Sequence, residues 1–269
     1  MKDETIDPNE VPEVVPDKIT SRFDFKAFAG IIALVISFHV VINYFISPDN
    51  TDTIVSVFSF FNPLVVTIIG FSVVAKYRGT IIFGKSYLAL SLGFLSLFLA
   101  EVTYMIYDLV YNIEPWPSIA DVFFFMLYPF LLFYLFKNIK FFSPKLSIRV
   151  KAWIIGMPLG VLATYSVLSV TIGEISIFEF DFYYGIIFVY AVTLTLSVAV
   201  IGAFIFKEGA IGKAWILFVA GILLMTIGDI WYYNLEVFGE YNLLHPVNMF
   251  WYAAYWVTIY ALIKQKRTI

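Results

Sequence analysis

Five carboxylates lie in stretches of this sequence that are otherwise strongly apolar, and they are the side chains best suited to chemistry. They are Glu101, Asp108, Asp121, Asp229 and Glu236. A carboxylic acid held away from water tends to keep its proton, so it can act as a proton donor or as a gate. A second carboxylate nearby could activate water. The candidates for catalysis are Glu101 or Asp229 as the acid and Asp121 or Asp108 as the base.

Tyrosines join these acids in two polar strips. Spacings of three and seven residues place an acid, a tyrosine and a second acid on one face of a helix. The first strip is Glu101, Tyr104 and Asp108, and the second is Asp229, Tyr232 and Glu236. Two polar pairs follow the strips, Asp121 with Tyr128 and Asn248 with Tyr255. We predict that these ten residues line one ligand-binding cavity.

Simpler roles for the same residues stay open. Ser118 and Asp121 have the spacing of a capping box, in which they would only start a helix. The second acid of each strip could simply be hydrated. A buried Glu101 or Asp229 could bond to a tyrosine and serve packing alone.

Several kinds of site are not expected. The chain has no cysteine, and its two histidines, His39 and His245, are far apart, so we predict no metal site. No phosphate-binding loop, dinucleotide-binding motif or hydrolase motif is present, and we predict no cofactor. We expect no nucleic-acid partner, because no basic face stands out.

The composition predicts the setting of these residues. The chain has 269 residues, of which 61% are hydrophobic and 14% charged. Soluble domains have about 45–50% apolar and about 25% charged residues. So few polar groups could not cover the surface of a soluble protein of this size. We therefore predict a multi-pass membrane protein.

Eight apolar segments are long enough to cross a bilayer as helices. A membrane barrel would show short alternating strands instead, so the fold class is all-α. The predicted spans cover residues 25–47, 53–75, 86–111, 119–138, 151–172, 182–206, 213–237 and 246–264.

The basic residues orient these spans. All 17 Lys and Arg residues lie in the N-terminal segment, in alternate loops or at the C-terminal end, and so on one side. The positive-inside rule places that side in the cytoplasm. We therefore predict a cell-membrane protein with both termini cytoplasmic and with the two polar strips in its outer half. Tyr233, Tyr241 and Trp251 are expected in an aromatic belt at the outer boundary.

An internal repeat is predicted at an offset of 128 residues. The stretch 84–87, Gly-Lys-Ser-Tyr, matches 212–215, Gly-Lys-Ala-Trp, and Glu101 matches Asp229. Each copy has four spans, an even number, so the copies are parallel and related by a pseudo-two-fold axis along the membrane normal.

The predicted organisation follows from the repeat and the charges. The first segment is acidic, proline-bearing and expected to be disordered. The parts are a cytoplasmic tail at 1–24, the first four-helix repeat at 25–138, a basic cytoplasmic linker at 139–150, the second repeat at 151–264 and a cytoplasmic C-terminus at 265–269.

One motif resembles a known class of membrane sensor. The run from Pro117-Ser118 through Asp121 to Tyr128-Pro129, preceded by Glu101-x2-Tyr104, is similar to membrane-sensor segments fused to bacterial diguanylate cyclase and phosphodiesterase domains. The chain departs from that class in having no signalling domain. It also has Ala-Glu where the class has Gly-Asp, although Gly228-Asp229 restores this pair in the second copy.

The second half resembles the lysoplasmalogenase-like YhhN family. The resemblance lies in Gly221-x7-Asp229-x6-Glu236, followed by Tyr255. It implies eight spans, acidic residues in corresponding helices at Glu101 and Asp229, and hydrolysis of the vinyl ether bond of lysoplasmalogens. The histidine of that family's fourth span is absent here.

Four classes of function are considered. We favour a membrane sensor or ligand-binding module with an outward-facing carboxylate and tyrosine cavity. The alternative is a membrane-embedded hydrolase of ether or vinyl ether lipids, and a further alternative is a structural subunit of a membrane complex. A transporter is less favoured, because no continuous polar pathway is visible. The expected partners are membrane lipids and a protein in the membrane or at the cytoplasmic tail.

Overall fold

The computed structural model describes residues 24–80, 82–113, 117–143, 145–173, 175–206, 212–238 and 241–268. Within these ranges every regular element is a helix. The elements are α1 (Phe25–Phe45), α2 (Pro48–Lys76), α3 (Phe83–Ile106), the π-helical turn η1 (Tyr107–Tyr111), α4 (Ile119–Phe142), α5 (Ile148–Thr171), α6 (Phe180–Phe206), α7 (Gly212–Phe238) and α8 (Asn248–Thr268).

Seven of the described helices, α1 to α7, are long and apolar enough to cross a membrane. The protein is therefore a multi-pass, all-helical membrane protein. The eighth predicted span is also a helix, α8, with 21 residues. It is less apolar than the other seven because it holds two tryptophans, three tyrosines and a basic last turn.

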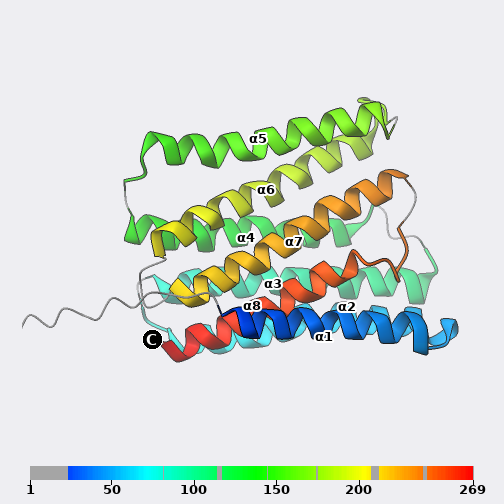
Figure 1. The fold of residues 1–269 in the computed structure, drawn as a ribbon, viewed down its shortest axis with the longest axis horizontal. Coiled ribbons are helices and arrows are strands. Elements are labelled where there is room, and N and C mark those ends of the chain that lie inside the picture. The colour runs from blue at the N-terminus through cyan, green and yellow to red at the C-terminus, as the bar shows by residue number, and fades with distance from the viewer. Residues whose placement is uncertain are drawn as a thin grey trace, which may run out of the picture.

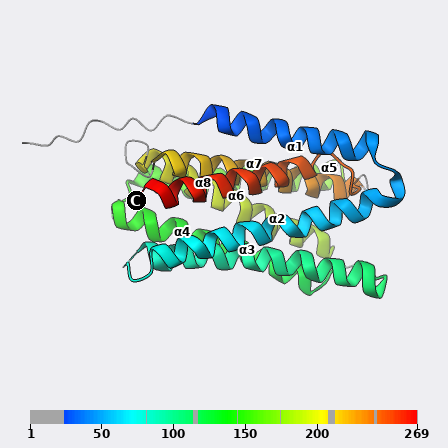
Figure 2. The ribbon, with the colours of Figure 1, turned by 90° about the horizontal axis from the view of Figure 1, so that it is seen from below.

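The helices lie alongside one another as a bundle, and consecutive helices run in opposite directions (Figure 1). The start of α1 and the end of α8 lie at the same end of this bundle (Figures 1 and 2). The basic residues of the described helix ends gather there as well. They include Lys26 in α1, Lys76 in α2, Lys85 in α3, Lys140 in α4, Lys151 in α5 and Arg267 in α8. We call this the basic end and the other the acidic end.

The packing partners of the helices define the core. α3 packs between α2 and α4, and α7 packs between α6 and α8. These two groups meet where α2 packs on α8 and where α4 packs on α6. α5 packs on α6 and α1 packs on α8. The largest core cluster lies among α2, α3, α4, α6, α7 and α8, with Tyr87, Tyr134 and Trp215 nearly inaccessible at its centre.

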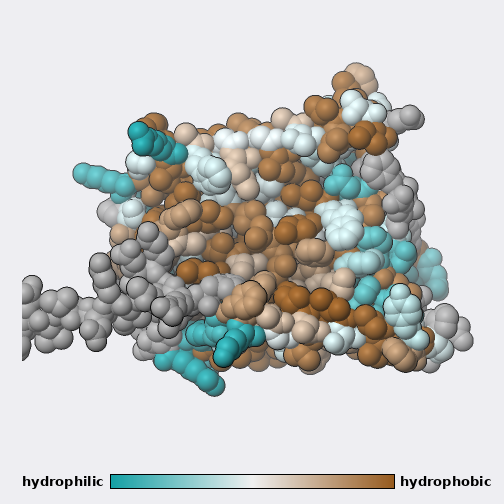
Figure 3. Space-filling view, viewed as in Figure 1, coloured by the Kyte–Doolittle hydropathy of each residue, from teal (hydrophilic) through white to brown (hydrophobic). Residues whose placement is uncertain are grey.

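The outer surface suits lipid. Apolar side chains cover the middle of the molecule and hydrophilic ones gather toward its ends (Figure 3). Of the seven candidate spans, α1 and α5 are the least buried inside the protein, and exposed residues such as Leu34 and Ile155 face outward from them. An apolar surface of this extent is expected on a protein whose solvent is the bilayer.

Asp24 links the start of α1 to the end of α8. Its carboxylate accepts hydrogen bonds from Lys264, with which it forms an ion pair, and from Tyr260 at 2.8 Å. It also caps α1 by accepting from the Ala27 amide at 3.4 Å. The bonds from Lys264 and then Tyr260 lower the pKa of Asp24 from 3.8 to about 2, because they favour the charged form.

Candidate functional site

Asp229 is the most closely bound acid of the two strips. It lies about 14 Å from the end of α7 that faces the acidic end, at 1.5 Å per residue. Tyr128 of α4 donates its hydroxyl proton to Asp229 Oδ2 at 3.0 Å, and Trp251 of α8 donates Nε1–H to Oδ1 at 2.8 Å. Asp229 is 7% exposed and Tyr128 3%. Both carboxylate oxygens are therefore occupied by donors from two other helices.

Aromatic rings surround this carboxylate. Tyr128 packs edge-on against Phe188 of α6 with ring centroids 5.2 Å apart, and Phe188 packs on Tyr233 of α7 at 4.7 Å. On the other side, Tyr232 packs edge-on against Trp251 at 5.4 Å. These contacts hold the two donors of Asp229 in position and exclude lipid from them.

Gly228 allows Trp251 to come close. A Cβ atom at this position would lie 2.9 Å from Trp251 Nε1 and 3.1 Å from Phe250 Cβ. Any larger residue would push α8 away from α7. The packing of these two helices therefore accounts for the glycine of the Gly228-Asp229 pair.

Glu101 has a different environment. It lies about 8 Å from the end of α3, is half-buried, and receives no hydrogen bond from the residues that the structure describes. Its carboxylate interacts electrostatically with Tyr241, Tyr252 and Tyr255. We call Glu101 the open acid, because it receives no hydrogen bond from the described residues, and Asp229 the closed acid, because each of its oxygens accepts one.

Tyr255 connects the two acids. It is 5% exposed and interacts electrostatically with both Glu101 and Asp229. The described residues show no hydrogen bond to its hydroxyl.

Tyr241 and Asn248 close the same region from the segment before α8. The Tyr241 hydroxyl donates to Asn248 Oδ1 at 3.3 Å, and Asn248 Nδ2 donates to the Leu243 carbonyl at 2.6 Å. Burial, followed by the neighbouring Tyr252 and Glu101, raises the pKa of Tyr241. This tyrosine therefore stays neutral and acts as a hydrogen-bonding group.

Asp121 starts α4. Its Oδ2 accepts the Ser118 amide at 2.6 Å while the Ser118 hydroxyl accepts the Ala120 amide, which completes a capping box. Its Oδ1 accepts from the Tyr184 hydroxyl of α6 at 3.1 Å. The capping role predicted from the spacing is confirmed, and Asp121 in addition holds α6 against α4.

The outer ends of the strips lie apart from these contacts. α3 gives way to η1 at Tyr107, so the regular α-helical spacing ends before Asp108, which is exposed. In a π-helical turn each hydrogen bond spans one more residue, which changes the direction of the following side chains. Tyr104 is 40% exposed. The side chain of Glu236 lies outside the described residues.

Four contributors to the site were missed in the sequence. Trp251 and Tyr233 were expected at the membrane boundary, but Trp251 binds Asp229 and Tyr233 is only 9% exposed. Tyr184 was not singled out. Tyr252 was also missed, and its hydroxyl is paired with that of Ser59 of α2 at 3.1 Å. Because 20% of the chain is aromatic, the sequence does not show which aromatic side chains reach the site. Only the packing of the helices distinguishes these four.

The described residues contain no group of three or more His, Cys, Asp or Glu side chains that could hold a metal ion. Through its two donors, Asp229 links α4, α7 and α8.

Comparisons of the chain with models of protein families, with curated proteins and with solved structures gave no match. The likenesses to sensor segments and to the YhhN family remain hypotheses drawn from short motifs.

Proposed function

We propose that this integral membrane protein is a ligand-binding or sensing module whose site lies in the outer half of the bundle. Glu101 is the acid that meets the ligand, with Tyr241, Tyr252 and Tyr255 beside it. Asp229, Tyr128 and Trp251 form the connection that reports the ligand to the rest of the bundle. The observation that supports this division most directly is that each oxygen of Asp229 accepts a hydrogen bond, whereas Glu101 receives none from the residues that the structure describes.

The chemistry of the open acid suggests the class of ligand. A carboxylate among tyrosine rings recognises an ammonium group through charge and through the negative faces of the rings. We propose a small or lipid-like ligand with an ammonium group, entering from the acidic end. Tyr104 and Asp108, which are exposed on the approach to Glu101, would contact it first.

Tyr255 is the proposed coupling residue. Its hydroxyl is subject to the electrostatic influence of both acids, so a ligand that neutralises Glu101 would leave Asp229 as the stronger attraction for it. Tyr255 would then turn toward Asp229, whose two oxygens can accept a third hydrogen bond beside those from Tyr128 and Trp251. A conformational response requires such a difference in contacts between two states.

We also propose that the bundle is a parallel repeat of four and four helices. The helix contacts support it, since α2 packs on α8 just as α6 packs on α4, and α3 and α7 have equivalent neighbours. The polar contacts support it too. Asp229 of one half meets Tyr128 of the other, and Glu101 interacts with Tyr255, its counterpart across the halves. The first helices of the two halves have different neighbours. α1 packs on α8, the last helix of the other half, whereas α5 packs on α6, the next helix of its own half.

The proposed orientation places the basic end in the cytoplasm of a cell membrane. The described basic residues at one end of the bundle support it. The ligand would then arrive from outside the cell, and a protein partner would be reached at the basic end.

A hydrolase has less support. Asp121, a proposed base, is engaged by the Ser118 amide and the Tyr184 hydroxyl, and Asp229 is held by two donors. A general base needs a free oxygen facing a water molecule.

Ligand binding can be tested by thermal unfolding of the purified protein with choline, tetramethylammonium and their neutral isosteres. The proposal predicts that an ammonium compound raises the melting temperature of the wild type but not that of Glu101→Gln, whereas Tyr44→Phe, on the outer face of α1, behaves as wild type. Equal stabilisation by the neutral isosteres, or of Glu101→Gln, would contradict it.

A further inference from the structure

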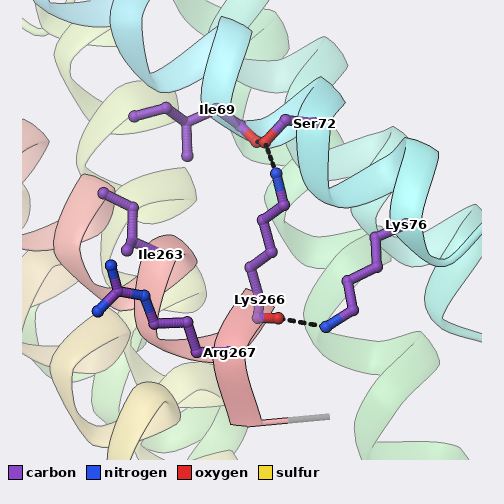
Figure 4. Close-up of a pocket in the computed structure, with 6 residues that line it drawn as sticks. All are labelled: Ile69, Ser72, Lys76, Ile263, Lys266 and Arg267. Atoms are coloured by element: carbon purple, nitrogen blue, oxygen red, sulfur yellow. Dashed lines mark hydrogen bonds between the residues drawn. The ribbon is translucent and has the colours of Figure 1, made fainter.

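A second site lies at the basic end, far from the two acids. An open pocket of about 490 Å³ lies between the last turns of α2 and α8 (Figure 4). We call it the basic pocket, and its lining residues are Ile69, Ser72, Lys76, Ile263, Lys266 and Arg267.

The basic pocket has an excess of positive charge. Three of its six lining residues are cationic and none is acidic, and Lys76, Lys266 and Arg267 are all exposed. Among the described residues none of the three forms an ion pair. The ion pair of Asp24 with Lys264 faces α1 instead of α2. An anion that neutralises the charge of this pocket must therefore come from outside the described residues.

The cations are held in place without being neutralised. Lys266 Nζ donates to Ser72 Oγ at 3.2 Å, and Lys76 donates to the main-chain carbonyl of Lys266 (Figure 4). The bond from Lys76 offsets the negative end of α8. An ammonium group has three donors, so both lysines keep protons for a ligand.

The lining changes from apolar to basic along both helices. On α2, Ile69 is followed by Ser72 and then by Lys76 at the helix end, and on α8 Ile263 precedes Lys266 and Arg267. Beside the pocket, Ile68 and Phe71 of α2 are exposed. This order matches a membrane lipid, whose acyl chain lies below its phosphate.

We propose that the basic pocket binds an anionic phospholipid, with its phosphodiester against Lys76, Lys266 and Arg267 and an acyl chain along Ile69 and Ile263. Basic groups at the cytoplasmic surface attract acidic lipids in general. The pocket adds a defined site, because its cations are oriented by Ser72 and by the α8 carbonyl. The bound lipid would tie α2 to α8, the two helices that join the halves of the bundle.

The test is native mass spectrometry of the full-length protein titrated with phosphatidylglycerol or with phosphatidylcholine of the same chains. Lys266→Gln with Arg267→Gln is expected to weaken the first phosphatidylglycerol site about thirtyfold, the effect of removing two interfacial charges. A matched control, Lys140→Gln with Arg149→Gln, removes two exposed charges from the same end and is expected to leave that site unchanged.

Four results would overturn the proposal. Tight phosphatidylglycerol binding in Lys266→Gln with Arg267→Gln would exclude the pocket, and an equal loss in the control would mean that only total charge matters. Glycerol phosphate competing as strongly as the lipid would show that a free phosphate ester is the ligand. If phosphatidylglycerol bound only after the acids of residues 1–22 were replaced by amides, the acidic N-terminal segment of the chain would be the occupant of the basic pocket.

Discussion

At the scale of single residues, two acids that look equivalent in the sequence have opposite environments. Asp229 accepts hydrogen bonds from Tyr128 and Trp251, and Glu101 accepts none from the described residues. Burial of a polar group is tolerated when its bonds are satisfied. Asp229 is therefore expected to matter for stability and Glu101 for ligand binding.

Substitutions of Asp229 should separate hydrogen bonding from charge. Asp229→Asn keeps an acceptor for Trp251, and its amide can donate to the Tyr128 oxygen, so we expect a small loss of stability. Asp229→Leu leaves two donors unsatisfied, at a cost of about 1–3 kcal/mol for each. Thermal unfolding in detergent checks this order. An Asp229→Leu protein as stable as Asp229→Asn would show that the two bonds contribute nothing.

At the scale of helices, the sequence predicted the elements closely. Predicted spans at 119–138 and 182–206 became α4 (Ile119–Phe142) and α6 (Phe180–Phe206), because long apolar runs and a capping box mark where such helices begin. The turn from α3 into η1 at Tyr107 was not predictable. Nothing in the spacing of Glu101, Tyr104 and Asp108 distinguishes α-helical from π-helical hydrogen bonding.

The close approach of α7 and α8 makes a testable prediction about glycine. Gly228→Ala places a methyl group 2.9 Å from Trp251 Nε1, and overpacking of this kind costs about 1–3 kcal/mol. Gly156 of α5 is the matched control, since a Cβ there meets nothing within 4 Å. Gly156→Ala should be neutral or stabilising, because alanine favours helices over glycine by about 1 kcal/mol.

Unfolding in denaturant measures both variants. If Gly228→Ala and Gly156→Ala changed stability alike, the contact between Gly228 and Trp251 would be unimportant.

The contribution of the Asp24 contacts that link α1 to α8 should depend on pH. The pKa of Asp24 is lowered to about 2 in the folded protein, so its contribution to stability is present above its unfolded pKa of about 3.9 and is lost as the pH falls through about 2. Asp24→Asn should therefore be less stable than the wild type at neutral pH, and the difference should shrink below pH 4. Melting temperatures across this range check it, and a constant difference would contradict it.

At the scale of the whole molecule, the arrangement of the helices was beyond the sequence. Periodicity tells which face of a helix is polar, but it does not tell which helix that face meets. Tyr128 and Asp229 are 101 residues apart, and their bond depends on α4, α6 and α7 packing together. The same holds for Trp251, whose indole could equally have faced lipid.

The absence of cysteine makes the orientation straightforward to test. Phe178 is exposed between α5 and α6, and Lys145 is exposed between α4 and α5, at the basic end. A single cysteine is introduced at each position, as Phe178→Cys or Lys145→Cys. A membrane-impermeant maleimide should label the first in intact cells and the second only after permeabilisation. The reverse pattern would place the basic end outside.

Glu101 is the open acid of this protein and Asp229 the closed one, so their reactivity should differ. Dicyclohexylcarbodiimide, a lipid-soluble reagent that reacts with carboxylic acids through their protonated form, tests this difference directly when membranes are treated in mildly acidic buffer and labelled peptides are mapped by mass spectrometry. Glu101 is expected to be modified while Asp229, with its two donors, is spared. Modification of Asp229 as fast as Glu101, or an unmodified Glu101, would contradict it.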